Sequence, residues 1–145
     1  MDGEEDAQLR NEHRSIQSAI KSALSEKGYI VEAEIDGTNY LPDKERHWYQ
    51  PDVVVRDGKR EIRYIVEVEN DPTRKTLVGA SILADYSIGE TGQRRKPCLI
   101  FVVYSKEGIK QIHNFEEKLV IARTYCGHLE AIEVVAWGSF KPAEL

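Results

Sequence analysis

The residues best suited to chemistry in this chain are carboxylates on two neighbouring apolar segments. Asp52 follows Pro51 at the head of a Val-rich segment. Glu67 and Glu69 flank Val68 at the end of the next segment. Alternate side chains of a strand point to the same face, so the two glutamates would lie about 7 Å apart on one face of a sheet. Carboxylates this close repel one another, and a divalent cation relieves the repulsion, so the spacing predicts a metal site.

The residues between the two apolar segments predict a β-hairpin. Asp57-Gly58 is typical of a tight turn, and it separates segments 52–56 and 61–69. Antiparallel pairing through this turn places Asp52 at the end of the hairpin that carries the two glutamates. Three carboxylates are therefore expected to converge on one sheet surface.

Hydrophobic periodicity predicts the elements that position this hairpin. Apolar residues recur at spacings of three, four and seven in the helical segments, and Gly28 follows the first of them as a C′ glycine. The continuous apolar run from Cys98 to Tyr104 is typical of a central strand covered on both faces. Residues 39–50 are polar and irregular, which predicts a loop, and Tyr86 and Phe101 are expected in the core. The expected helices are 7–27, 73–88 and 107–125, and the expected strands are 29–35, 52–56, 61–69, 98–104 and 129–137. The order αβββαβαβ predicts an α/β fold with a mixed β-sheet flanked by helices.

Composition narrows the class of protein. The chain has 145 residues, 41% hydrophobic and 31% charged, which favours one domain over residues 1–145 with loose ends at 1–6 and 139–145. The net charge of −5 argues against bulk coating of nucleic acid but leaves local basic patches open. The two isolated cysteines indicate reduced thiols, as in a cytoplasmic, intracellular protein. The longest apolar run is too short for a membrane span, so no membrane association is expected.

The order of elements and the acidic motif together resemble the PD-(D/E)xK nuclease superfamily, which has a restriction-endonuclease-like fold. That family carries an acid on its first helix, Pro-Asp at the head of one hairpin strand and acid-x-Lys on the next strand. In this chain Glu12, Pro51-Asp52 and Glu67-Val68-Glu69 stand at those places. The first helix, with a glutamate near its start and a glycine after its end, is similar to that of archaeal Holliday-junction resolvase-type members.

The resemblance implies metal-dependent hydrolysis of phosphodiester bonds in DNA, by an endonuclease. Asp52, Glu67, the Val68 carbonyl and Glu12 would hold Mg²⁺ or Mn²⁺, and a metal-polarised water would attack the phosphate. The resemblance also implies duplex or branched DNA as the substrate. A homodimer is expected as well, through an exposed surface of the third helix or a strand edge.

Glu69 departs from the family pattern, which has lysine at that place. A glutamate can bind a metal or act as a general base, but it cannot supply a cation. Lys75, at the start of the second helix, is the nearest replacement, so the expected catalytic residues are Asp52, Glu67, Glu69 and Lys75. The alternative is a nuclease-fold module with weakened or lost activity that serves nucleic-acid binding or protein assembly.

Two groups of basic residues are candidates for contacts with nucleic acid. Positive side chains near the carboxylates would neutralise phosphates, although an ordinary solvated loop explains the hairpin group equally well. The candidates are Arg94, Arg95 and Lys96 before the fourth strand, and Lys59 and Arg60 in the hairpin turn. The four histidines share no ligand-like spacing and are expected at the surface or in loops.

Overall fold

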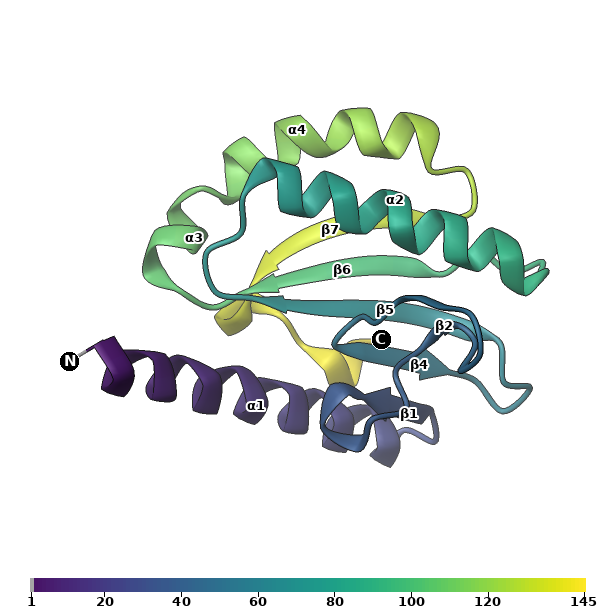
Figure 1. Cartoon of the computed structure of the whole chain (residues 1–145), viewed down its shortest axis with the longest axis horizontal. Helices are drawn as coiled ribbons and strands as arrows, with labels where there is room; N and C mark the ends of the chain where they lie inside the picture. Colours follow the sequence, from purple (N-terminus) through teal and green to yellow (C-terminus); the bar gives the residue numbers. More distant parts are fainter. Residues whose placement is uncertain (1) are drawn as a thin grey trace.

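A mixed β-sheet forms the centre of the computed structural model, which describes residues 2–145 apart from the side chains of Asp2 and His47 (Figure 1). The strands of this sheet are β1 (Ile30–Ala33), β4 (Val53–Arg56), β5 (Ile62–Glu69), β6 (Cys98–Val103) and β7 (Ala131–Ala136). They lie in the order β1-β4-β5-β6-β7, antiparallel from β1 to β5 and parallel from β5 to β7. The expected α/β class, with a mixed sheet and flanking helices, is confirmed.

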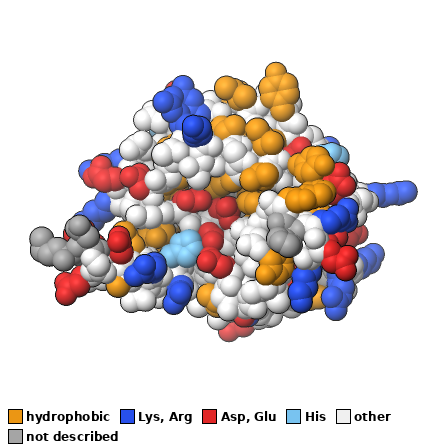
Figure 2. Space-filling view, viewed as in Figure 1, with side chains coloured by type: hydrophobic (Ala, Val, Ile, Leu, Met, Phe, Trp, Pro, Cys, Tyr) orange, Lys and Arg blue, Asp and Glu red, His pale blue; other side chains and the backbone are white. Residues whose placement is uncertain are grey.

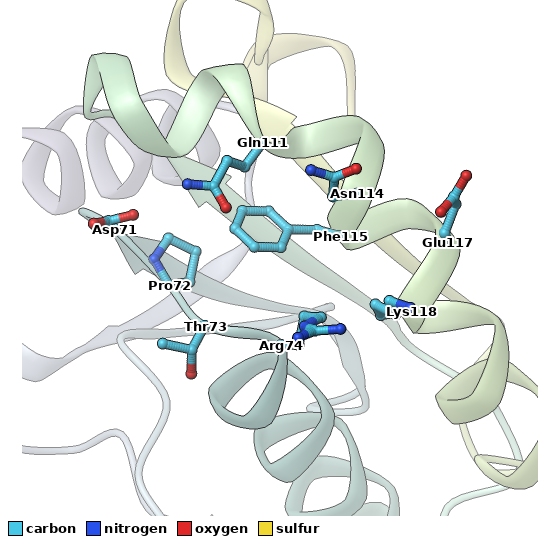
Figure 3. A pocket seen from close by; sticks show the side chains of 9 residues that line it. All are labelled: Asp71, Pro72, Thr73, Arg74, Gln111, Asn114, Phe115, Glu117 and Lys118. Atoms are coloured by element: carbon cyan, nitrogen blue, oxygen red, sulfur yellow. The ribbon is translucent and has the colours of Figure 1, made fainter.

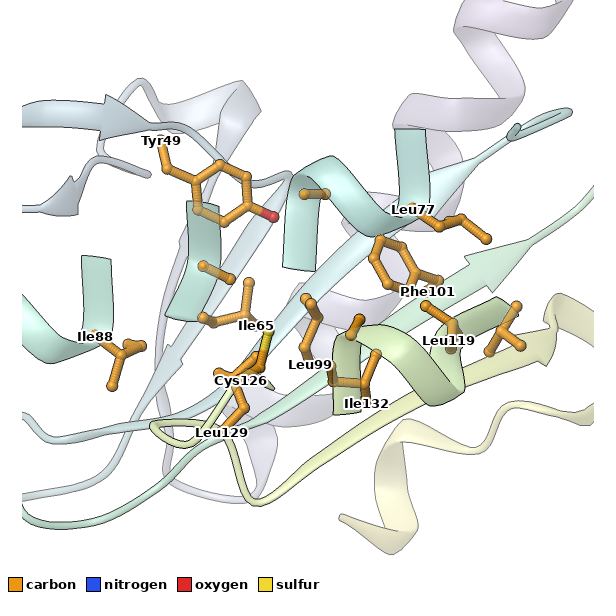
Figure 4. Packing of buried hydrophobic residues seen from close by; sticks show 14 of the residues in the cluster. Tyr49, Ile65, Leu77, Ile88, Leu99, Phe101, Leu119, Cys126, Leu129 and Ile132 are labelled. Atoms are coloured by element: carbon orange, nitrogen blue, oxygen red, sulfur yellow. The ribbon is translucent and has the colours of Figure 1, made fainter. Parts of the chain in front are cut away.

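The helices cover the two faces of the sheet. They are α1 (Asp2–Glu26), α2 (Arg74–Thr91), α3 (Lys106–Lys110) and α4 (Ile112–Tyr125). The α1 helix packs on one face through Ile16, Ile20 and Leu24. The α2 and α4 helices pack on the other face, where Leu77 and Leu119 meet side chains from the sheet (Figure 4).

Strand alternation divides the sheet residues between these two layers. In β5, Ile65 packs under α2 and α4, whereas Val66 and Val68 pack under α1. In β6, Leu99, Phe101 and Val103 face α2 and α4, whereas Ile100 and Val102 face α1. The continuous apolar run of β6 therefore reflects a central strand buried on both faces, as the sequence predicts.

The chain between β1 and β4 contains more regular structure than the expected loop. A 3₁₀ turn, η1 (Glu34–Asp36), is followed by two short antiparallel strands, β2 (Leu41–Pro42) and β3 (His47–Tyr49). These strands pack against α2. The expected third helix is also divided in two, because Gln111 has φ −99° and ψ 1° and interrupts the helical geometry. Tyr86, expected in the core, is 55% exposed on the outside of α2.

Helical turns are found near both ends of the described residues. Residues 2–6 belong to α1, and Met1 lies outside the described residues. The C-terminal end forms two short 3₁₀ turns, η2 (Trp137–Ser139) and η3 (Pro142–Glu144). The Leu145 carbonyl accepts a hydrogen bond from the Lys27 ammonium, and the Leu145 side chain packs against the α1 layer. Within residues 2–145, no helix combines the length and the apolar character that a membrane crossing requires.

Candidate metal centre

Asp52 and Glu67 meet where β4 begins and β5 ends. The Asp52 backbone N–H donates to Glu67 Oε1 over 2.7 Å, and the Val68 N–H donates to Asp52 Oδ2 over 2.7 Å. The antiparallel register of β4 and β5 produces this contact, because it pairs Val53 with Val66 and leaves Asp52 beside the next residues of β5. The structure thus brings together the two carboxylates that the hairpin predicted.

Two hydrogen bonds from the chain that follows β1 hold the backbone around Asp52. The Asp52 carbonyl accepts from the Glu34 N–H over 2.9 Å. The buried Asn39 amide donates to the Pro51 carbonyl over 2.7 Å. These two contacts fix the direction in which the Asp52 carboxylate leaves the chain.

Three further side chains reach this carboxylate, from α1 and from η1. His13 Nε2 lies 3.2 Å from Asp52 Oδ1 and 3.6 Å from Glu34 Oε2. The Gln17 amide donates to Glu34 Oε2 over 2.9 Å and to Asp52 Oδ1 over 3.3 Å. One ligand atom from each of His13, Glu34 and Asp52 lies within 4.8 Å of the others, a spacing that a metal ion can bridge.

Burial disfavours the simultaneous ionisation of Asp52, Glu67 and Glu69. Desolvation is the main cause that raises the pKa of Asp52, of Glu67 and of Glu69, and it raises the pKa of Glu69 to about 7. The charge of Asp52 raises the pKa of both glutamates further, and the pKa of Glu67 stands well above its usual range. A cation in this group would offset the repulsion and the desolvation.

For His13 and for Glu34, the surroundings favour the charged form of the side chain instead. The hydrogen bond to Asp52 raises the pKa of His13, which favours its protonated form beside the carboxylate. The hydrogen bond from Gln17 lowers the pKa of Glu34. A protonated His13 would supply part of the compensating positive charge, and a metal ion would replace that charge on binding.

The backbone of β5 also offers an oxygen to this group. The N–H and C=O of one residue in a strand point to the same side. Because the Val68 N–H points to Asp52, the Val68 carbonyl points to the β4 side as well. The Glu69 carbonyl instead accepts from the Tyr104 N–H over 3.1 Å, on the β6 side. Tyr49 of β3 is buried near Glu67, and the pKa of its hydroxyl is strongly raised, first by burial and then by the charge of Glu67.

The sequence also predicts Glu12 as a metal ligand and Lys75 as a catalytic residue. Glu12 is exposed on α1 and, like Glu67, does not belong to the set formed by His13, Glu34 and Asp52. Burial first, and then the charges of Glu12, Glu69 and Asp52, raise the pKa of Tyr104, so Glu12 lies at the carboxylate end of the sheet. Lys75 is exposed and lines a hollow between α2 and α4 with Val78, Lys118 and Ile121.

The residues predicted to contact nucleic acid lie at the end of the sheet opposite to the carboxylates. Lys59 and Arg60 belong to the closed end of the β4–β5 hairpin. Arg94, Arg95 and Lys96 precede β6, whose first residue pairs with Tyr64, whereas Glu69 pairs with the last residue of β6. Tyr64 and Glu69 are five positions apart along β5, or about 16 Å.

Other cations lie at the carboxylate end. Arg10 and Arg14 of α1 line a hollow of about 330 Å³ with His13, Glu34 and Tyr104. In the sequence these arginines share one helical face with His13 and Gln17, at spacings of three and four, and this polar stripe was the available signal for the site. Histidine, acidic and basic side chains are also adjacent on the face shown in Figure 2.

A larger hollow, of about 580 Å³, opens between the start of α2 and the start of α4 (Figure 3). Phe115 lies between the two helices, and Arg74 and Lys118 bring positive charge to the rim. Residues 70–73 lead directly from the end of β5 into α2, so this hollow belongs to the same end of the sheet as the carboxylates.

Comparison of the chain with protein-family models, with curated proteins and with solved structures finds no match.

Proposed function

We propose that this protein is a metal-dependent DNA endonuclease that hydrolyses phosphodiester bonds. The observation that supports the proposal most is the reciprocal hydrogen bonding between Asp52 and the Glu67-Val68 segment, with His13 and Glu34 against the same carboxylate. The order and pairing of the elements support a restriction-endonuclease-like fold. A helix precedes the hairpin, and α2 connects β5 to the parallel strand β6.

The oxygen-rich set favours Mg²⁺ or Mn²⁺ over softer metals. Asp52, Glu67 and the Val68 carbonyl would hold the ion, and His13 takes the helix-borne position that the resemblance gives to Glu12. Bound there, the ion would polarise water and neutralise charge on the phosphate. Glu69, whose pKa is raised by burial and also by the charge of Asp52, which is close enough to act on it, would bind the ion or accept a proton from the attacking water.

The test is an assay of supercoiled, linear and branched DNA with the purified chain in Mg²⁺ or Mn²⁺. We expect metal-dependent nicking or cleavage of at least one substrate and no cleavage in EDTA. A chain that leaves every substrate intact in both metals would refute the enzymatic proposal.

A second candidate function is a nuclease-fold module without catalysis, for nucleic-acid binding or assembly. Glu69 in the place of the family lysine, together with the position of Lys75 in the hollow beside α4, favours it. Calorimetric titration with Mn²⁺ separates the two candidates. Heat of binding that disappears in Glu67→Gln supports the nuclease, and no Mn²⁺ uptake supports the module.

We expect DNA binding to depend on the α1 arginines rather than on those before β6. Arg10→Gln/Arg14→Gln should weaken binding of a labelled duplex and reduce the slope of log K against log salt by about 2, because two phosphate contacts are lost. The matched control, Arg94→Gln/Arg95→Gln, removes the same charge at the far end of the sheet. Fluorescence anisotropy in EDTA measures both, and a larger loss in the control pair would contradict this prediction.

A further inference from the structure

The outer surface of α2 exposes large apolar side chains that the proposed site does not use. Ile82 and Tyr86 are each 55% exposed, and Leu83 is 45% exposed. The Trp48 ring lies 5.3 Å from the Tyr86 ring, and Ile121 of α4 adjoins Val78. We call these six residues the α2 face. Figure 2 shows hydrophobic side chains gathered over the region in which Figure 1 places α2 and α4.

The α2 face has opposite charges at its two ends. Lys75, Val78, Ile82, Tyr86 and Glu90 follow one another at spacings of three and four, so they form one stripe along the helix. Arg74 and Lys118 adjoin Lys75 at one end. At the other end Glu90 is exposed and lies 3.7 Å from Arg46, whose guanidinium contacts Asp43 more closely, at 2.8 Å.

Two copies of the α2 face have complementary charges when their α2 helices run antiparallel. With a rise of about 1.5 Å per residue, Lys75 lies about 10 Å from Ile82 on one side and Glu90 about 12 Å on the other. A two-fold axis at Ile82 therefore brings each lysine near the partner subunit's Glu90. The reverse, parallel arrangement would place like charges together at both ends.

We propose that the α2 face is the contact of a homodimer in which two α2 helices cross antiparallel at Ile82. The same axis places Val78 opposite the partner subunit's Tyr86. Gly79 adds no side chain to this surface, and a Cβ there would meet nothing within 4 Å, so the space beside Val78 is open to the incoming ring. A shallow crossing of about 20° keeps the charged ends within reach of their side chains.

The antiparallel crossing fixes where the two carboxylate groups lie. The α2 helix begins directly after the end of β5, so its first turn marks the carboxylate end of each subunit. In the dimer these ends point in opposite directions, and each site stays open to solvent at its own end. The dimer does not depend on nuclease activity, so it can be tested whether or not the chain cleaves DNA.

Sedimentation equilibrium over a range of concentrations up to about 200 µM tests the dimer. We expect a wild-type dimer that Ile82→Glu converts to a monomer. The matched control Ile109→Glu introduces the same charge at a partly exposed isoleucine of α3 and should remain dimeric. A monomeric wild type, a dimer that survives Ile82→Glu, or an equal effect of the control overturns the proposal.

Charge reversal tests the orientation without removing an apolar contact. Lys75→Glu and Glu90→Lys should each raise the dimer dissociation constant about tenfold, since each places like charges across the axis. The double variant restores opposite charges and should return the dissociation constant close to the wild-type value. Additive losses in the double variant would refute the antiparallel arrangement.

Discussion

Replacement of Asp52 by asparagine is expected to lower the rate of DNA cleavage by at least about a thousandfold, or about 4 kcal/mol of transition-state stabilisation. Asp52 is the residue on which the site converges, because it contacts His13, Gln17 and the backbone of β5. The neutral amide is a poor ligand for a hard cation, so Mn²⁺ binding measured by calorimetry should be lost with the activity.

The stability of this variant should change much less than its activity. Asparagine keeps an oxygen that can accept from the Val68 N–H, but its amide faces the donating amide of Gln17. Against this loss, the substitution removes a desolvated charge that also raises the pKa of Glu67 and of Glu69. We expect the free energy of unfolding in urea, without metal, to change by no more than about 1 kcal/mol.

Glu26→Gln is the matched control for this experiment. It removes one carboxylate from an exposed position in the last turn of α1, away from Asp52, and should leave cleavage, Mn²⁺ binding and stability unchanged. Retention of more than about a tenth of wild-type cleavage by Asp52→Asn would show that the metal is held by other groups.

The contact between Asp52 and Glu67 could be predicted from the sequence because it depends on local rules. A turn at Asp57-Gly58 and alternation along two short strands are enough to bring the carboxylates to the open end of one hairpin. The same reasoning applies to Lys59 and Arg60, which must lie at the closed end. The hairpin geometry therefore separates these two residues from the carboxylates, and their contact with nucleic acid stays a prediction.

The contributions of His13, Gln17 and Glu34 depend on tertiary packing. Ile16, Ile20 and Leu24 dock α1 on the sheet, and the angle of that docking decides which polar residue of the helix reaches Asp52. Helical periodicity fixes the polar stripe but not its height above the strands, so periodicity alone could not decide between His13 and Glu12, and the choice of Glu12 depended on the resemblance. The α2 face was missed for a related reason, since an apolar stripe on a helix predicts burial without saying what covers it.

Without metal, the chain is expected to become more stable as the pH falls from 8 to about 5. A carboxylate whose pKa is higher in the folded than in the unfolded state disfavours folding above its folded pKa. That penalty is lifted as the pH falls toward the unfolded value. Glu69 has a pKa of about 7 against an ordinary value of 4.5, and Glu67 and Asp52 are shifted in the same direction.

His13 acts in the same direction over this range. Its raised pKa contributes stability that is fully present below the ordinary value of 6.5 and is lost as the pH rises through the folded value. Glu34 sets the lower limit, because its lowered pKa contributes stability that is lost as the pH falls below 4.5. For Glu69 alone we expect a gain on the order of 2–3 kcal/mol between pH 8 and pH 5.

Urea unfolding at several pH values, in EDTA and in saturating Mn²⁺, measures this dependence. Glu69→Gln should flatten the metal-free profile by about the contribution of that residue, whereas Glu26→Gln should reproduce the wild-type profile. Mn²⁺ should reduce the slope, because the ion binds the deprotonated carboxylates and neutral His13, and a hundredfold excess over its dissociation constant adds about 2.7 kcal/mol at pH 8. A metal-free chain that instead loses stability from pH 8 to pH 5 would contradict the burial of these carboxylates, and with it the electrostatic reason for a metal ion at this end of the sheet.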